Sequence, residues 1–402
     1  MKSKWIMALV VLILVTLACV PGAPNPTDPV TVPTETETGP VVLPSDTETA
    51  PPVVEEPTDA LEPTIEPTAT ETPPEPLRPV VYYQYPADPS LVTVVDPSTG
   101  AVLRTFSAPG PGWMGEGAVG GESIFYITST GTALYRVGFD GVVQDLTFAH
   151  PTPGFFDAVI LPSPDGQRIA WGSVLSMDAS GTDVELKVAN IDGSDLRVLL
   201  DGRMTESRRP SPIKFSNDGQ YLYYTNMPYG IGGYILFYGG PDLIRINTTT
   251  LVAETILPDN KCLCAMEFSP DESKVARIDR SGGSLSLVVH EMAGGAETRF
   301  SFPVKYTQAG GIIWSPDGNN LMLTLALGNP DTEVYSVVKI DLVTSVMTYF
   351  LSDDARCLRT REWVDPDVAW LSDKDYNVYR MDAATGALTW HAANGYVISN
   401  SD

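Results

Sequence analysis

The sequence predicts an all-β fold, a β-propeller of four-stranded antiparallel blades, because one strand–turn–strand pattern recurs at a regular spacing. Its clearest copy is Ile313-Trp314-Ser315-Pro316-Asp317-Gly318, which a second apolar run follows. Proline presets φ at such a corner, and glycine accepts a positive φ. The corner aspartates are 53, 53, 46 and 50 residues apart, at Asp165, Asp218, Asp271, Asp317 and Asp367. A period of about 50 residues is long enough for one four-stranded sheet per repeat.

The first 19 residues predict an export signal. Lys2 and Lys4 precede an apolar run from Trp5 to Ala18, which is too short for a comfortable membrane span and matches a signal peptide. The segment Val15-Thr16-Leu17-Ala18-Cys19 resembles the lipobox of bacterial lipoproteins. This resemblance implies that residues 1–18 are removed, that Cys19 is acylated, and that the protein is lipid-anchored and faces outside the cytoplasm. The alternative is an ordinary signal peptide, or an uncleaved anchor, with an incidental cysteine.

Residues 19–78 predict a disordered tether behind the acylated cysteine. Residues 20–78 consist mostly of Pro, Thr, Glu, Val and Ala, and they carry −11 of the total charge of −25. Prolines remove backbone donors and like charges repel, so this segment cannot bury a core. If extended, it reaches roughly 180 Å at about 3.1 Å per residue.

The folded body is expected to span residues 79–402 and to contain seven blades, with six or eight as alternatives. Its first unit, residues 80–106, has three strands and no corner before them. The run Gly395–Ser399 at the other end of the chain is a spare strand. We expect it to complete the first blade, so that exchange of the chain ends closes the ring and removes an open sheet edge. The intervening units are expected at residues 113–148, 155–200, 208–257, 262–302, 306–351 and 362–391.

The corners, together with strand endings such as Val188-Ala189-Asn190-Ile191-Asp192-Gly193, resemble the WD40-like repeats of TolB-type propellers. The resemblance covers most of residues 113–391 and implies the propeller fold. It implies little about function, because such propellers serve as scaffolds, sensors and enzyme domains alike.

The sequence lacks the common catalytic motifs. It has no Gly-x-Ser-x-Gly elbow, no phosphate loop with its lysine and no His-Glu-x-x-His. The three histidines fall at different phases of the repeat, so no shared metal site and no cofactor are expected; His150 is the one catalytic candidate. The corner aspartates are expected to be structural, since a carboxylate at a turn accepts hydrogen bonds from the N–H groups that follow it.

A binding face is predicted on the side of the disc that carries the connections between blades. These connections hold seven basic residues, and the insertion 227–240 is rich in aromatic residues and glycine. Guanidinium groups beside aromatic rings suit carboxylated sugars, acidic peptides or other anions. The candidate contacts are Trp113, Phe155, Phe156, Arg208, Arg209, Tyr229, Tyr234, Tyr306, Arg359 and Arg361. The alternative is that these are solvated charges paired with neighbours such as Glu206 and Glu362.

Three cysteines remain after acylation of Cys19. Export permits a disulfide, and the sequence favours a Cys264–Cys357 or a Cys262–Cys357 bridge, with one thiol left over. A zinc site is not expected, because no fourth ligand is evident.

The expected function is that of a monomeric, non-enzymatic module that presents its loop-rich face to a protein or glycan of the cell envelope. The acidic body, with −16 on residues 79–402, argues against nucleic acid and anionic headgroups, so that membrane contact is through the lipid anchor alone. One alternative is a polysaccharide lyase or lactonase with a histidine or cation at the channel mouth; another is a scaffold for assembly of an envelope complex. The enzyme would bring His150 and two or more carboxylates together on the axis.

Overall fold

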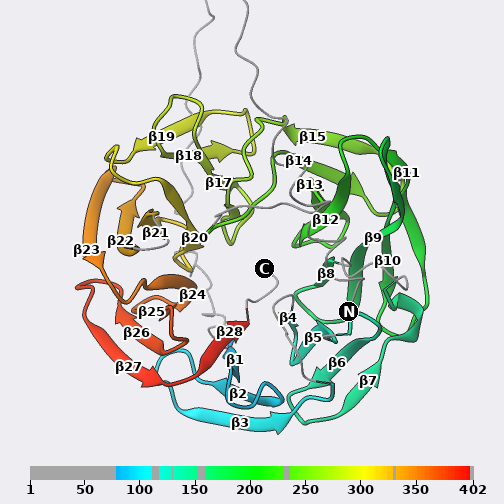
Figure 1. Ribbon diagram of the computed structural model, residues 1–402, viewed down its shortest axis with the longest axis horizontal. Helices are drawn as coiled ribbons and strands as arrows, with labels where there is room; N and C mark the ends of the chain where they lie inside the picture. Colours follow the sequence, from blue (N-terminus) through cyan, green and yellow to red (C-terminus); the bar gives the residue numbers. More distant parts are fainter. Residues whose placement is uncertain are drawn as a thin grey trace, which may run out of the picture. The chain divides into compact units, whose positions relative to one another are not determined.

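The computed structural model describes residues 78–110, 117–128, 130–151, 159–229, 236–328 and 332–398. These residues form seven four-stranded antiparallel sheets and one short 3₁₀ helix, η1 (Thr147–Ala149). The sheets stand around a ring as the blades of a propeller (Figure 1). The predicted all-β fold and the predicted number of blades are confirmed. The expected signal peptide, Cys19 and residues 20–77 of the tether lie outside the described residues.

The first four blades follow the chain from residue 80. Blade 1 comprises β1 (Val80–Gln84), β2 (Leu91–Val95), β3 (Val102–Ser107) and β28 (Gly395–Ile398). Blade 2 comprises β4 (Ala118–Gly120), β5 (Ser123–Ile127), β6 (Leu134–Gly138) and β7 (Val143–Asp145). Blade 3 comprises β8 (Val159–Pro162), β9 (Arg168–Asp178), β10 (Gly181–Asn190) and β11 (Arg197–Met204). Blade 4 comprises β12 (Arg208–Phe215), β13 (Tyr221–Pro228), β14 (Leu243–Asn247) and β15 (Ala253–Leu257).

The last three blades complete the ring. Blade 5 comprises β16 (Met266–Phe268), β17 (Lys274–Asp279), β18 (Ser286–Glu291) and β19 (Glu297–Ser301). Blade 6 comprises β20 (Gln308–Trp314), β21 (Asn320–Leu327), β22 (Val334–Asp341) and β23 (Val346–Asp354). Blade 7 comprises β24 (Arg359–Asp365), β25 (Val368–Ser372), β26 (Val378–Asp382) and β27 (Leu388–Ala392). Figure 1 shows one end strand of each sheet toward the centre and the other at the rim.

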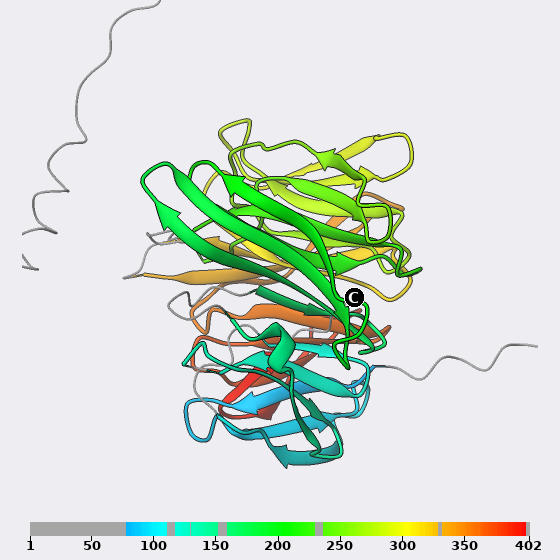
Figure 2. The same ribbon diagram turned by 90° about the vertical axis from the view of Figure 1, so that its right-hand side faces the viewer.

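The apolar core lies between blades. The largest cluster joins side chains of blade 5, such as Leu287 and Phe300, to side chains of blade 6, such as Trp314 and Leu323. Figure 2 shows the twisted sheets of successive blades stacked against one another. Each sheet therefore depends on its neighbours for the cover of its faces, as a repeat architecture requires.

The chain ends close the ring as predicted. Strand β28 pairs antiparallel with β1, with Val81 opposite Ile398 and Gln84 opposite Gly395. Val397 and Ile398 are buried. The inner strand of blade 1 thus comes from the far end of the described chain, and β1 has a partner on each side.

The corner serines and aspartates hold the turn between the first two strands of a blade. At the corner of blade 6, the Ser315 hydroxyl donates to Asp317 Oδ1 (2.5 Å) and accepts the N–H of Asn320 (2.9 Å). The same carboxylate oxygen accepts the N–H of Asn319 (3.0 Å), and the serine hydroxyl is the main cause of a lowered Asp317 pKa. Equivalent bonds join Ser163 to Asp165, Ser216 to Asp218 and Ser269 to Asp271.

The structural role predicted for the corner aspartates is therefore confirmed in four blades. In blade 7 the accepting carboxylate is Asp365, which takes the N–H of Asp367 (2.8 Å). The role expected of Asp367 thus belongs to Asp365, which pairs with Val368 across a shorter turn than the one between Trp314 and Leu321 in blade 6. In the described part of the chain, no helix has the length and apolar character needed to cross a bilayer.

Candidate functional site

Only part of the predicted binding face lies within the described residues. Trp113, Phe155, Phe156 and Tyr234 lie outside the described residues. Four of the seven cations of this face contact carboxylates. Arg208 contacts Glu206 (2.8 Å) and Asp259 (2.9 Å). Further ion pairs join Lys261 to Asp259, Lys305 to Asp353 and Arg356 to Asp354. This pairing agrees with the alternative of solvated, neutralised charges and lowers the attraction of the face for anions.

Several of the predicted contact residues serve the fold. Tyr306 is buried, and its hydroxyl donates to Ser336 Oγ (2.9 Å). The guanidinium of Arg359 lies over the ring of Tyr335 and donates to its hydroxyl (3.2 Å). The backbone N–H of Tyr229 donates to the Ser207 carbonyl (2.6 Å). Arg209 is half-buried on β12. These residues do not gather around one surface pocket.

Arg361 leads to a different site, a cavity of about 680 Å³ along the inner strands of blades 4 to 7. Many of its lining residues lie on β12, β16, β20 and β24, the inner strands of these blades, of which Figure 1 labels β12, β20 and β24 around the centre. The cavity reaches Gly239 and Gly240 on the side of the loops between blades. It also reaches Asn217 and Pro316 at the corners on the opposite side.

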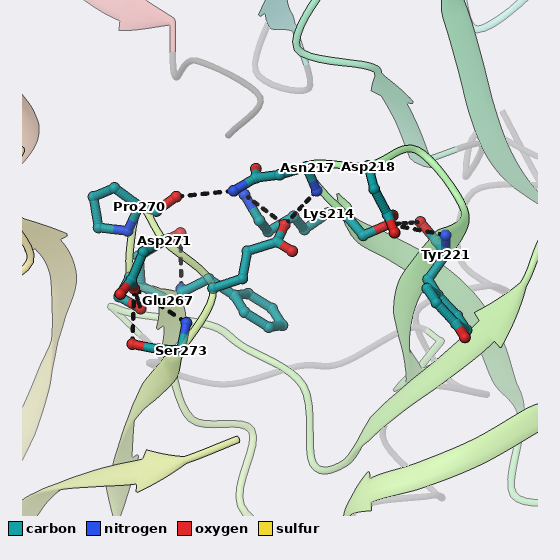
Figure 3. A network of polar contacts seen from close by, with 12 residues as sticks. Lys214, Asn217, Asp218, Tyr221, Glu267, Pro270, Asp271 and Ser273 are labelled. Atoms are coloured by element: carbon teal, nitrogen blue, oxygen red, sulfur yellow. Dashed lines mark hydrogen bonds and ion pairs between the residues drawn. The ribbon is translucent and has the colours of Figure 1, made fainter. Parts of the chain in front are cut away.

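A buried lysine lies in the cavity wall. Lys214 on β12 is 2% exposed, and its Nζ is 3.5 Å from Glu272 Oε1. Asn217 fixes this carboxylate by donating its backbone N–H to Glu272 Oε1 (2.8 Å), and its side-chain amide donates to the Pro270 carbonyl (3.0 Å). Figure 3 shows Lys214 and Asn217 of blade 4 facing the corner of blade 5 that contains Pro270. Burial lowers the pKa of Lys214, and Glu272 opposes this effect.

Glu267 on β16 lines the same cavity and titrates near neutrality. Burial raises the pKa of its carboxyl to about 7, against the opposing charge of Lys214. The side chain keeps some contact with solvent, as a wall of an open channel should. Trp314 packs beside it and donates its indole N–H to the Glu267 carbonyl (3.1 Å). The centre of the cavity therefore combines a cation, a titrating carboxyl and an aromatic wall.

Sequence reasoning missed this channel centre. Lys214, Glu267 and Ser211 were not among the candidates, and Trp314 was considered only as part of a corner. The available signal was their position on the first strand of each unit, which faces the axis of a propeller. Polar residues on such strands indicate either a polar network in the core or the lining of a central channel.

The catalytic candidate His150 lies away from the cavity. His150 follows η1, and its Nε2 lies 2.5 Å from Asp145 Oδ1 near the outer strand β7. It is not a lining residue of the central cavity. Among the residues that the structure describes, no group of three or more His, Cys, Asp or Glu side chains is placed to hold a metal ion.

The cysteines pair differently from the prediction. The structure joins Cys262 to Cys264, whose Cα atoms are 5.1 Å apart. Cys357 is a buried free thiol that donates to the Glu333 carbonyl (3.3 Å). Neither predicted bridge to Cys357 is present, because the start of blade 7 places this thiol against the Glu333 loop of blade 6, and Cys264 already has a partner two residues away.

Comparisons with known proteins find distant structural similarity alone. No family model and no curated protein matches the chain. Among solved structures, it is similar to TolB from Acinetobacter baumannii, with 15% identity over 72% of this chain and 66% of that chain and a TM-score of 0.41. A putative TolB from Agrobacterium tumefaciens gives 13% identity over 67% and 87%, with a TM-score of 0.43.

An oligogalacturonate lyase from Vibrio parahaemolyticus gives 11% identity over 78% of this chain and 90% of that chain, with a TM-score of 0.47. At these values the similarity carries no argument about function. The functional conclusion below therefore comes from the residues of this chain.

Proposed function

We propose that this protein is a non-enzymatic binding module that takes its ligand into the central channel of the propeller. The cavity of about 680 Å³ carries this proposal, because its volume lies within the range of about 300–1,000 Å³ typical of ligand pockets. Its wall combines apolar side chains with a few polar groups, as such pockets do. The partner class is a protein or glycan of the cell envelope.

The loop-rich face contributes the rim of this site. Arg361, near the start of β24, and the glycine pair Gly239–Gly240 of the insertion within blade 4 both line the cavity. A ligand presented from the envelope would enter here. We further propose that Cys19 carries the lipid anchor, and that residues 20–78 extend the propeller away from a bacterial membrane as a monomer.

A filled-channel variant tests the binding site. Met266 lies on the cavity wall and is half-buried, so Met266→Trp should fill the channel. The matched control, Val346→Trp, adds the same side chain to the outer strand β23, where Val346 is 54% exposed. Protein and glycan fractions of an envelope extract are passed over each immobilised protein.

We expect the wild type and Val346→Trp to retain the same component, and Met266→Trp to lose it. Equal retention by all three would place the site elsewhere, and retention of nothing by any of them would contradict a binding module.

Labelling with radioactive palmitate checks the lipid anchor. The label should be present in the wild type and absent in Cys19→Ala. The enzyme alternative predicts that the wild type cleaves polysaccharide and that His150→Ala abolishes this cleavage. We expect no cleavage by either protein.

A further inference from the structure

A buried hydroxyl in the channel has no partner. Ser211 lies on the inner strand β12, is 7% exposed and belongs to the wall of the central cavity. Its Oγ has no hydrogen-bond partner among the residues that the structure describes. Most buried polar groups in folded proteins are hydrogen-bonded, and leaving one unpaired destabilises the folded state. A hydroxyl kept at this position is suited to meet a polar atom of a ligand.

The polar groups around this hydroxyl differ in what they offer. Lys214 Nζ only donates hydrogen bonds, whereas the Glu267 carboxyl accepts them when ionised and also donates when protonated, and the Ser211 hydroxyl both donates and accepts. A ligand that satisfies all three must therefore offer both hydrogen-bond donors and acceptors. Alcohol hydroxyls have this property, whereas carboxylates only accept and ammonium groups only donate.

The charges in the wall do not favour an ionic ligand. Lys214 already faces Glu272, so an anion would compete with a carboxylate that Asn217 holds in place. Cationic Arg78 and Arg361 and acidic Glu267 and Glu362 all line the cavity, so either sign of ligand charge would meet a like charge. The balance favours an uncharged ligand.

Two indole rings supply apolar surface. Trp314 and Trp363 line the cavity, and each donates its ring N–H to a backbone carbonyl, of Glu267 (3.1 Å) and of Pro366 (3.4 Å). The polar edge of each ring is therefore occupied, and only a small part of its carbon surface reaches the cavity, because both side chains are largely buried in the core between blades. Aromatic rings of this kind pack well on other flat, C–H-rich surfaces.

We propose that the channel binds a neutral oligosaccharide, a glycan segment whose hydroxyls bond Ser211, Lys214 and Glu267 while a sugar ring packs on the tryptophan wall. This inference rests on the proposed function and specifies its ligand class. A sugar ring combines hydroxyls on its edge with C–H groups on its faces, which is the combination that this wall presents. The cavity volume suits a few sugar rings rather than a folded partner.

The test uses isothermal titration calorimetry on the full exported protein. The probes are the neutral tetrasaccharides maltotetraose, cellotetraose and chitotetraose, with tetragalacturonate as the charged comparison. We expect at least one neutral probe to bind and Ser211→Ala to weaken its affinity about five- to tenfold, the effect of one lost hydrogen bond. The control Ser180→Ala, at an exposed serine of the β9–β10 turn, should bind as the wild type does.

Thermal unfolding separates loss of binding from loss of fold. Because Ser211→Ala removes an unpaired buried group, its melting temperature should equal or exceed that of the wild type. Equal affinity of the wild type and Ser211→Ala, or tighter binding of tetragalacturonate than of every neutral probe, would overturn the inference.

The two proposals fail in different ways. If no tetrasaccharide binds but the envelope fractions yield a protein that Met266→Trp fails to retain, the glycan inference is wrong and the binding module stands. If neither the tetrasaccharides nor any envelope component is retained, both are wrong.

Discussion

Replacing Glu267 by glutamine should remove a pH-dependent loss of stability. The pKa of this carboxyl rises from its ordinary 4.5 to about 7 in the folded protein, mainly through burial. The folded state therefore keeps the proton over a pH range in which the unfolded chain has released it. The free energy of unfolding falls with rising pH wherever the folded state holds more protons than the unfolded chain. The free energy of unfolding should thus decrease as the pH rises from about 4.5 to about 7, and this contribution should be constant above that.

The size of the effect follows from the same shift. Raising a pKa from 4.5 to about 7, at about 1.36 kcal/mol per pH unit, corresponds to about 3 kcal/mol. Contact of the side chain with solvent in the channel reduces this figure, so we expect about 1–3 kcal/mol. The glutamine amide of the Glu267→Gln variant imitates the protonated carboxyl without titrating. The variant should match the wild type below pH 4.5 and exceed it by about this amount at pH 8.

Urea unfolding of both proteins at pH 4.5, 6, 7 and 8 measures the difference. At each pH, the difference between the free energies of unfolding of the two proteins cancels the contribution of most other titrating groups, including the corner aspartates. The control Glu122→Gln removes the same charge from an exposed glutamate of blade 2, so it separates the loss of a surface carboxylate from the loss of a buried one. A constant offset between the wild type and Glu267→Gln across this range would refute the claim that burial in the channel controls this carboxyl.

Three further predictions concern the ring itself. Ser315→Ala removes a hydroxyl that bonds both Asp317 and the Asn320 N–H, and should lower the free energy of unfolding by about 1–3 kcal/mol in urea titrations. Deleting residues 395–402 removes β28 with two buried aliphatic side chains and should cost about 3–6 kcal/mol; size-exclusion chromatography should also show association through the open edge of β1. Iodoacetamide should leave the buried Cys357 unlabelled in the native protein and label it only after unfolding, as mass spectrometry can show.

The fold was predictable because its signals are local. Each corner is encoded within six residues, as in Ser315 to Asn320, and it repeats often enough to set the blade length. The strand Gly395–Ile398 could be assigned to blade 1 by counting strands. The exchange of Asp367 for Asp365 in blade 7 was not predictable, because it accompanies a shorter turn, in which Asp365 pairs with Val368.

The site was less predictable because its parts meet only when the ring closes. Lys214 and Glu267 are 53 positions apart in the chain, and neither belongs to a motif. The charge pairing of the loop face likewise depends on distant partners, as between Lys305 and Asp353. A count of basic residues along the chain could not show that these carboxylates would neutralise them.

The closing strand also has a consequence for the order of folding. Strand β28 follows all the other described strands in the chain, yet it completes the blade that contains β1. A chain that emerges from its N-terminal end can assemble blades 2 to 7 while the inner edge of blade 1 stays bare. During that interval a second nascent copy could dock its own β28 there and interlock two rings. Rapid release of the final residues after synthesis, or a chaperone that shields β1, would keep each ring single.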